Sequence, residues 1–185
     1  MINYEDLFNE AKEANADPRY FGLGFIQITV PSGRYHFYCK DLNPSLDDEE
    51  VHNHRYWFRS EVLKGVLWNG IYSVIEDEEQ GQYEVADVTC KPGQTGEPEI
   101  LMKSVSLVSL VNFLTSAGSS YLIKRAAYHM VQPRSDFVIT RLDRGTYESP
   151  TAQVVRKKNS PFVCPYETPL TVDDCWVWIR KAIES

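Results

Sequence analysis

The chain has 185 residues, a length typical of one domain that buries a substantial core. Charged residues make up 24% and aromatic residues 12% of it, a composition that excludes wholesale disorder and favours β-sheet. The formal net charge of -7 argues against a nucleic-acid partner, because binding to a phosphate backbone needs clustered lysine and arginine.

The N-terminus, the apolar runs and the cysteine spacing indicate the cellular location. The first six residues lack the basic and apolar regions of a signal peptide, and no apolar run reaches the length of a membrane span. We therefore expect a cytoplasmic protein with reduced thiols and no membrane partner. No cysteine pair has CxxC spacing, and the basic cluster at 156–158 is interpreted as a solvated loop.

The first half of the chain contains one expected helix and several expected strands. Residues 3–15 are expected to form a helix, because apolar residues recur at helical spacing after Asn3, a suitable N-cap. Asp17-Pro18 ends this helix. From there the pattern is typical of β-structure, with turns rich in glycine, proline and acidic residues. The expected strands are 21–30, 34–40, 51–65, 66–76 and 82–90. In 34–40, alternation puts Tyr35, Phe37 and Cys39 on one face and His36 and Tyr38 on the other.

In the second half, the apolar run 101–114 is ambiguous between strand and helix, and is a candidate for a second sheet or for an interface. Residues 121–131 and 136–142 resume the strand pattern, and Thr171 caps a helix at about 172–184. Short strands at near-regular intervals predict an all-β sandwich or barrel. We expect one domain over residues 1–185, with the β-barrel at about 20–145.

The histidines carry the strongest chemical signal. His52 and His54 are two residues apart, and in an extended strand residues i and i+2 point to the same face. His129 lies far downstream in another expected strand. If the strands meet, three imidazoles can bind one metal ion. The sequence therefore predicts a metal site at His52, His54 and His129.

The residues around these histidines have a recognisable pattern. His52 and His54 are followed by Trp57, Phe58, Ser60, Val62, Leu63 and Gly65; farther on come Gly118, Tyr121-Leu122-Ile123, Tyr128-His129 and Pro133. The two stretches resemble the first and second conserved motifs of the cupin superfamily. The resemblance implies a mostly β, double-stranded β-helix of the jelly-roll type, with a divalent metal held by the three histidines.

The glutamate that cupins often add to this ligand set has no clear counterpart. Its usual position holds Phe58, and the nearest acid is Glu61, an odd number of residues after His54. In an unbroken strand Glu61 would face away from the histidines unless a bulge turned it inward. We therefore favour a three-histidine site over one that includes Glu61. Three-histidine iron occurs in the thiol dioxygenases of this superfamily.

The ligand set limits the chemistry. Neutral imidazoles suit iron, zinc, nickel or copper better than magnesium or calcium, and we expect iron first, with zinc or nickel as alternatives. Three ligands leave coordination positions open for dioxygen and a small-molecule substrate. The expected function is a small-molecule enzyme of the dioxygenase type, an oxidoreductase, with Tyr128, Arg59 and Glu61 as catalytic candidates. Candidates to orient the imidazoles or to contact the substrate are Tyr128, Arg59, Tyr38 and Gln27.

Other readings of the same residues stay open. The chain could be a non-catalytic ligand-binding or protein-interaction jelly-roll module, or a metal-free cupin isomerase or epimerase that uses a histidine as base. Four arginines could bind an anionic substrate at the mouth of the barrel, but a role as exposed surface charge is favoured for them. They are Arg59, Arg125, Arg134 and Arg141. The family resemblance also implies a homodimer formed through edge strands.

Overall fold

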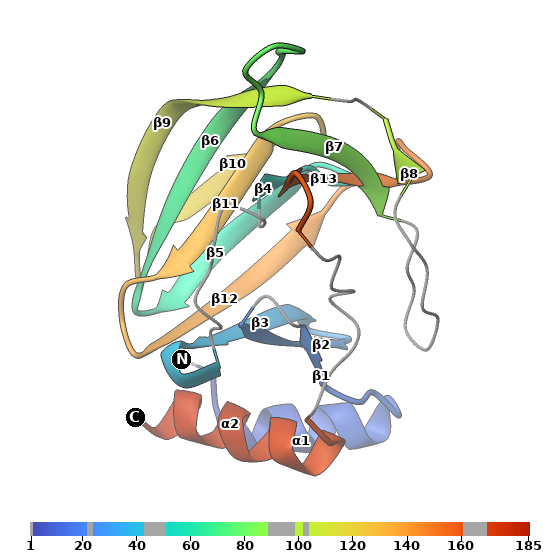
Figure 1. The fold of residues 1–185 in the computed structure, drawn as a ribbon. Helices are drawn as coiled ribbons and strands as arrows, with labels where there is room; N and C mark the ends of the chain where they lie inside the picture. Colours follow the sequence, from blue (N-terminus) through green and yellow to red (C-terminus); the bar gives the residue numbers. More distant parts are fainter. Residues whose placement is uncertain (1, 22–23, 43–50, 89–98, 102–103, 161–169) are drawn as a thin grey trace.

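The computed structural model describes residues 2–21, 24–42, 51–88, 99–101, 104–160 and 170–185. These residues form two antiparallel β-sheets with one helix near each end of the chain (Figure 1). The helices and strands, with one 3-10 turn, are α1 (Tyr4–Glu13), β1 (Arg19–Phe21), β2 (Phe25–Val30), β3 (Gly33–Cys39), η1 (Lys40–Leu42), β4 (Val51–His52), β5 (Phe58–Lys64), β6 (Val66–Glu76), β7 (Tyr83–Val88), β8 (Glu99–Ile100), β9 (Val105–Ser116), β10 (Ser120–Ile123), β11 (Tyr128–Pro133), β12 (Phe137–Arg144), β13 (Ala152–Lys157) and α2 (Val172–Glu184).

Each sheet combines strands from the first and the second half of the chain. The first sheet has six strands in the order β1-β2-β3-β12-β5-β10. The second has seven, in the order β13-β4-β11-β6-β9-β7-β8, and an additional pairing of β13 with β7 nearly closes it into a ring. The expectation of a mostly β, jelly-roll-like body with short terminal helices is confirmed.

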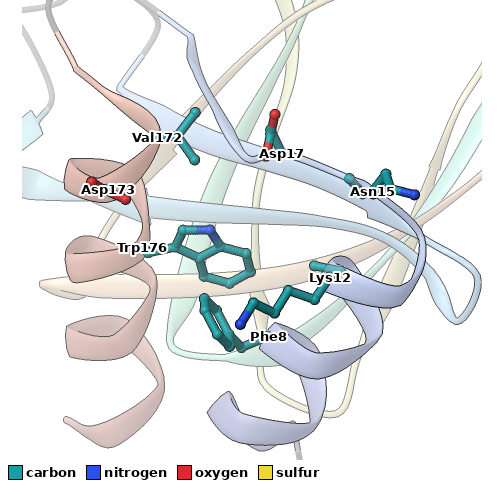
Figure 2. A pocket seen from close by; sticks show the side chains of 9 residues that line it. Phe8, Lys12, Asn15, Asp17, Val172, Asp173 and Trp176 are labelled. Atoms are coloured by element: carbon teal, nitrogen blue, oxygen red, sulfur yellow. The ribbon is translucent and has the colours of Figure 1, made fainter.

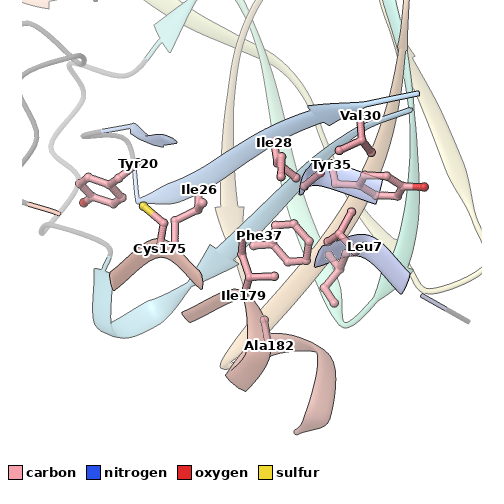
Figure 3. Close-up of a cluster of buried hydrophobic side chains, with 12 residues drawn as sticks. Leu7, Tyr20, Ile26, Ile28, Val30, Tyr35, Phe37, Cys175, Ile179 and Ala182 are labelled. Atoms are coloured by element: carbon pink, nitrogen blue, oxygen red, sulfur yellow. The ribbon is translucent and has the colours of Figure 1, made fainter. Parts of the chain in front are cut away.

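The two helices pack against one face of the first sheet (Figure 3). Leu7 and Ile179 contribute to a cluster with Ile26, Ile28 and Phe37, all at most 3% exposed. Full burial of such a side chain is worth about 1.5–3 kcal/mol, so this cluster fixes the helices on the sheet. As predicted, Asn3 caps α1, and Thr171 caps α2 through a reciprocal capping box with Asp174.

A pocket of about 270 Å³ lies between the ends of these helices (Figure 2). Phe8 and Trp176 line it, together with Lys12 and Asp173. None of the three predicted ligand histidines lines this pocket. No helix in the described part of the chain is long and apolar enough to cross a membrane.

Strand β3 has two buried faces, which determines what lies between the sheets. Tyr35 and Phe37 face the helices, whereas Tyr38 packs with Val138 against Leu67 of the second sheet. Because side chains alternate along a strand, Arg34 and His36 share the inner face with Tyr38. The space between the sheets therefore receives polar side chains from β3.

The predicted strand 51–65 is wrong in its extent. It divides into the two-residue β4, irregular backbone at 53–57, and β5. The predicted strand 121–131 likewise divides into β10 and β11, with a turn between them. From Val105 onward the ambiguous run 101–114 is resolved as a strand, because β9 pairs with β6 between Val105 and Ser116.

The sheets also extend beyond the predicted barrel limit of about residue 145. Strand β13 was not predicted, because its apolar centre is only Val154-Val155 and a basic cluster follows. The loop interpretation of that cluster is wrong for Arg156 and Lys157, which lie in β13. Arg156 pairs with Glu84 at 2.6 Å, with both side chains largely buried. Lys158 donates a hydrogen bond to Ser104.

Candidate metal centre

The three predicted ligand histidines come together between the sheets. One ring nitrogen from each of His52, His54 and His129 lies within 4.8 Å of the other two. Their ring centroids are 4.8 Å (His52–His54), 4.8 Å (His52–His129) and 4.9 Å (His54–His129) apart. The Nε2 atoms of His54 and His129 are 2.7 Å apart. The predicted convergence is confirmed.

Strand register places two of these rings. His52 in β4 lies directly opposite His129 in β11. Opposite residues of an antiparallel pair point to the same face, with Cβ atoms about 4.5–5.5 Å apart. The ladder of backbone hydrogen bonds therefore presents both imidazoles to one point.

His54 reaches this point by a different route from the one predicted. It lies beyond the end of β4, in irregular backbone, so strand alternation does not align it with His52. Its backbone N–H donates to the carbonyl of Arg125 at 3.3 Å. Its ring contacts Phe58 edge-on, with centroids 4.7 Å apart. The loop and its apolar support thus orient the third imidazole.

Asn53 and Gln153 fix the backbone between the two histidines. The Asn53 N–H donates to the Gln153 carbonyl at 3.0 Å, and the Gln153 N–H donates to Oδ1 of Asn53 at 2.7 Å. Their side chains also join, because Nδ2 of Asn53 donates to Oε1 of Gln153 at 3.0 Å. The Tyr128 hydroxyl donates to the same Oε1 at 2.6 Å. This network ties the segments that carry all three histidines.

Burial keeps two of the rings neutral. It lowers the pKa of the His129 imidazole well below 6.5, and the neighbouring His52 charge lowers it further. The pKa of His54 is also well below 6.5, first through burial and then through His52 and His129. A neutral imidazole has the lone pair that a metal ion needs. Nδ1 of His129 is buried and has no hydrogen-bond partner, so part of its bonding capacity is unused.

Apolar side chains surround the histidines. Phe58, Ile123 and Leu142 form a buried cluster with Ile71 and Tyr121. Phe58 contacts both His54 and His129, at centroid distances of 4.7 and 5.7 Å. An apolar surrounding limits the access of water and strengthens electrostatic interactions at the centre.

The three catalytic candidates lie outside the histidine cluster. Glu61 pairs with Arg141 at 3.1 Å, and both side chains are about two-fifths exposed. Arg59 donates to the Ser120 hydroxyl at 3.1 and 3.2 Å. In β5 these two residues alternate with the buried Phe58 and Ser60, so they face away from the centre. The Tyr128 hydroxyl is directed to Gln153.

Residues expected to orient the imidazoles have other partners. Oε1 of Gln27 is 3.2 Å from Nε2 of His36, and Tyr38 packs against Phe25 and His36. Gln153 instead takes the positioning role, and no motif in the sequence identified it. Two of the arginines that could bind an anion have carboxylate partners, since Arg125 pairs with Glu148 as Arg141 does with Glu61.

Comparison of the chain with family models, with curated proteins and with solved structures finds no match. We therefore infer the function from the geometry of the histidine cluster and from the chemistry of the side chains around it.

Proposed function

We propose that this chain is a cupin-like metal-binding protein whose centre is His52, His54 and His129. The observation that carries the proposal is the approach of three imidazole nitrogens, from three separate parts of the fold, to within 4.8 Å of one another. Bonds from imidazole nitrogen to a transition metal are about 2.0–2.1 Å long, so only small ring adjustments would bring three such nitrogens onto one ion.

The donor set fits a divalent transition metal. The described residues within this cluster include no carboxylate, and Glu61 is engaged by Arg141. Neutral imidazoles favour iron, zinc or nickel over magnesium and calcium, and iron is the metal that we propose first. Three ligands leave positions open, which distinguishes a catalytic site from a closed structural one.

The proposed reaction is an oxidation of the dioxygenase type on a small molecule. A bound iron would supply the redox and Lewis-acid chemistry. In a dioxygenation both atoms of O₂ enter the substrate, which itself provides the electrons, so no separate reductant is needed. The chain's own part is to hold the three neutral imidazoles, to keep water away through Phe58 and Ile123, and to orient the substrate.

Several features support the cupin-like assignment. The body consists of two antiparallel sheets, and the paired histidines lie beside a third histidine on a neighbouring strand. The turn before β10 contains Gly118, whose φ is +83°, a conformation that glycine adopts without strain. These features are also compatible with a ligand-binding module, so the proposal depends on the metal and not on the fold alone.

We further propose that two copies associate through β9. In the described chain, β9 pairs with β7 only through Val105 and Tyr83, which leaves most of one edge open. Leu110 and Leu114 on this strand are 61% and 62% exposed. No charged residue occurs between Ser104 and Ile123, so two such edges can meet antiparallel without repulsion despite the net charge of -7.

The test of the metal assignment is elemental analysis of protein purified without a histidine tag. One iron per chain, with O₂ consumption in a substrate screen, would support the oxygenase. One zinc or nickel per chain would support the metal site and contradict the oxygenase. If no metal is bound and a chelator leaves the melting temperature unchanged, the metal proposal fails. His52→Ala would then separate the two remaining functions, because only a metal-free isomerase would lose turnover.

A further inference from the structure

Three arginines gather around two tyrosines beside the metal centre. Arg34 donates to the Tyr56 hydroxyl at 2.9 Å. The Arg144 guanidinium carbon lies 5.5 Å from the Tyr56 ring centroid and 4.7 Å from that of Tyr147. The Arg55 guanidinium carbon is also 4.7 Å from the Tyr147 ring. We call these five residues the arginine–tyrosine cluster.

The register of the first sheet explains how two of these arginines meet. Arg34 in β3 lies opposite Leu142 in β12, and Arg144, two residues farther along β12, lies opposite Phe58 in β5. Leu142 and Phe58 belong to the apolar cluster around the histidines. Opposite and alternate residues share a face, so Arg34 and Arg144 both occupy the inner face of the sheet.

Backbone bonds hold the rest of the cluster. The Gly145 N–H donates to the Trp57 carbonyl at 2.9 Å, and the Glu148 N–H donates to the Arg55 carbonyl at 2.8 Å. A Cβ at Gly145 would clash with the Trp57 indole, so a larger residue there would require the indole or the backbone to move. Arg55, Tyr56 and Tyr147 are thus fixed by a paired loop.

The positive charge of the cluster is not neutralised. Arg125, Arg141, Arg156 and Arg180 each have a carboxylate within 4.0 Å, whereas no carboxylate of the described residues pairs with Arg34, Arg55 or Arg144. Nε of Arg34 is buried with no hydrogen-bond partner. The cluster therefore combines an unsatisfied buried donor on Arg34 with two further guanidinium groups that no carboxylate of the described residues pairs with.

The cluster adjoins the histidines. The rings of His54 and Tyr56 are 5.8 Å apart, and Tyr56 in turn contacts Arg34 and Arg144. A small molecule held by the arginines would therefore extend toward the proposed metal.

We infer that the arginine–tyrosine cluster binds the oxyanion group, a carboxylate or a phosphate, of the small molecule that the metal centre acts on. That this small molecule is a substrate rests on the proposed function, although its binding to the cluster can be measured without metal. The planar guanidinium group binds oxyanions through paired, charge-assisted hydrogen bonds. Tyr56 and Tyr147 hold the arginines in place by their hydrogen bond and ring contacts.

The test compares two double variants with the same change of charge. Arg34→Gln/Arg144→Gln removes two guanidinium groups of the cluster, and Arg59→Gln/Arg134→Gln removes two exposed ones elsewhere. Calorimetric titrations of inorganic phosphate and of malonate, at low ionic strength, measure affinity in metal-free and metal-loaded protein. We expect the cluster variant to bind the preferred anion at least about tenfold more weakly than wild type. The matched control should stay within about twofold, and the tighter of the two probes identifies the oxyanion.

The possible results separate the two proposals. If both double variants lose affinity equally, or if neither probe binds the wild type, the inference is overturned. If the chain takes up no metal but still binds the anion, and the cluster variant alone loses affinity, the oxyanion site is supported and the proposed function is overturned. Arg144→Lys guards against misfolding: it keeps the charge but not the paired geometry, so a folded Lys variant should bind more weakly than wild type and more tightly than the double variant.

Discussion

His52 and His129 are direct partners across the antiparallel ladder of β4 and β11. The backbone hydrogen bonds of the sheet therefore position two of the three imidazoles. The third, on His54, depends on the loop that Asn53 and Gln153 join to β13. The centre thus has a rigid pair of ligands and one ligand whose position depends on side-chain hydrogen bonds.

Removal of the Gln153 side chain should weaken metal binding without removing a ligand. In Gln153→Ala, the Tyr128 hydroxyl and Nδ2 of Asn53 lose their shared acceptor. Loss of supporting hydrogen bonds around metal ligands typically weakens affinity about 10–100-fold, and we expect about 1–3 kcal/mol lower stability. Competition with a chelator measures the affinity.

Two further variants identify the cause of that loss. Gln153→Glu keeps an acceptor for both donors and should restore much of the affinity. Asn112→Ala removes an asparagine that bonds to Ser109 on the exposed strand β9, and should leave the affinity unchanged. Wild-type affinity in Gln153→Ala would show that the network does not position His54.

The sequence alone predicted the elements whose residues interact locally. The terminal helices follow from their caps and apolar stripes, and the alternation in β3 correctly separates Tyr35 and Phe37 from His36. The divided strand at 51–65 could not be predicted, because the irregular segment at 53–57 contains no glycine or proline and includes the aromatic Tyr56 and Trp57. Strand β13 has too short an apolar centre to be distinguished from a loop.

For the site, the sequence identified the three ligands but not the reason that they meet. The convergence depends on the pairing of β4 with β11, which is a long-range register rather than a local pattern. The arginines considered from sequence have other partners, whereas Arg34 and Arg144 meet through the pairing of β3 with β12. Strand alternation puts Arg34 on the same face as His36, and this is the one local signal that the sequence holds for Arg34.

His36 should make the protein less stable in mild acid. It is 8% exposed, and burial, with a further contribution from Arg34, lowers its pKa from 6.5 to about 3. The unfolded chain then binds a proton between these pH values that the folded chain does not bind. Stability therefore falls as the pH drops below about 6.5, by about 2 kcal/mol between pH 7 and pH 5 from this imidazole.

Urea unfolding of wild type and His36→Gln at both pH values isolates this effect. Glutamine can still donate to Gln27 but does not titrate, so the variant should lose about 2 kcal/mol less than wild type over this interval. Equal losses in the two proteins would mean that His36 is protonated in the folded state at pH 5.

A charge on β9 should prevent self-association. Leu110→Glu would place two carboxylates near each other in an antiparallel pair of β9 edges, and we expect the dimer dissociation constant to rise at least about tenfold. Val177→Glu provides a matched control, because Val177 is 54% exposed on α2, away from β9. Sedimentation equilibrium measures both. A wild-type chain that stays monomeric at high concentration would refute the proposed interface.

The most direct test of the metal centre is the X-ray absorption spectrum of the metal-loaded protein, with the metal content of two variants. We predict one metal per chain with three imidazole nitrogens at about 2.0–2.1 Å. His129→Ala should lose the metal or retain only two imidazoles, whereas Glu61→Ala should match wild type. Metal loss in Glu61→Ala together with full retention in His129→Ala would contradict the three-histidine centre.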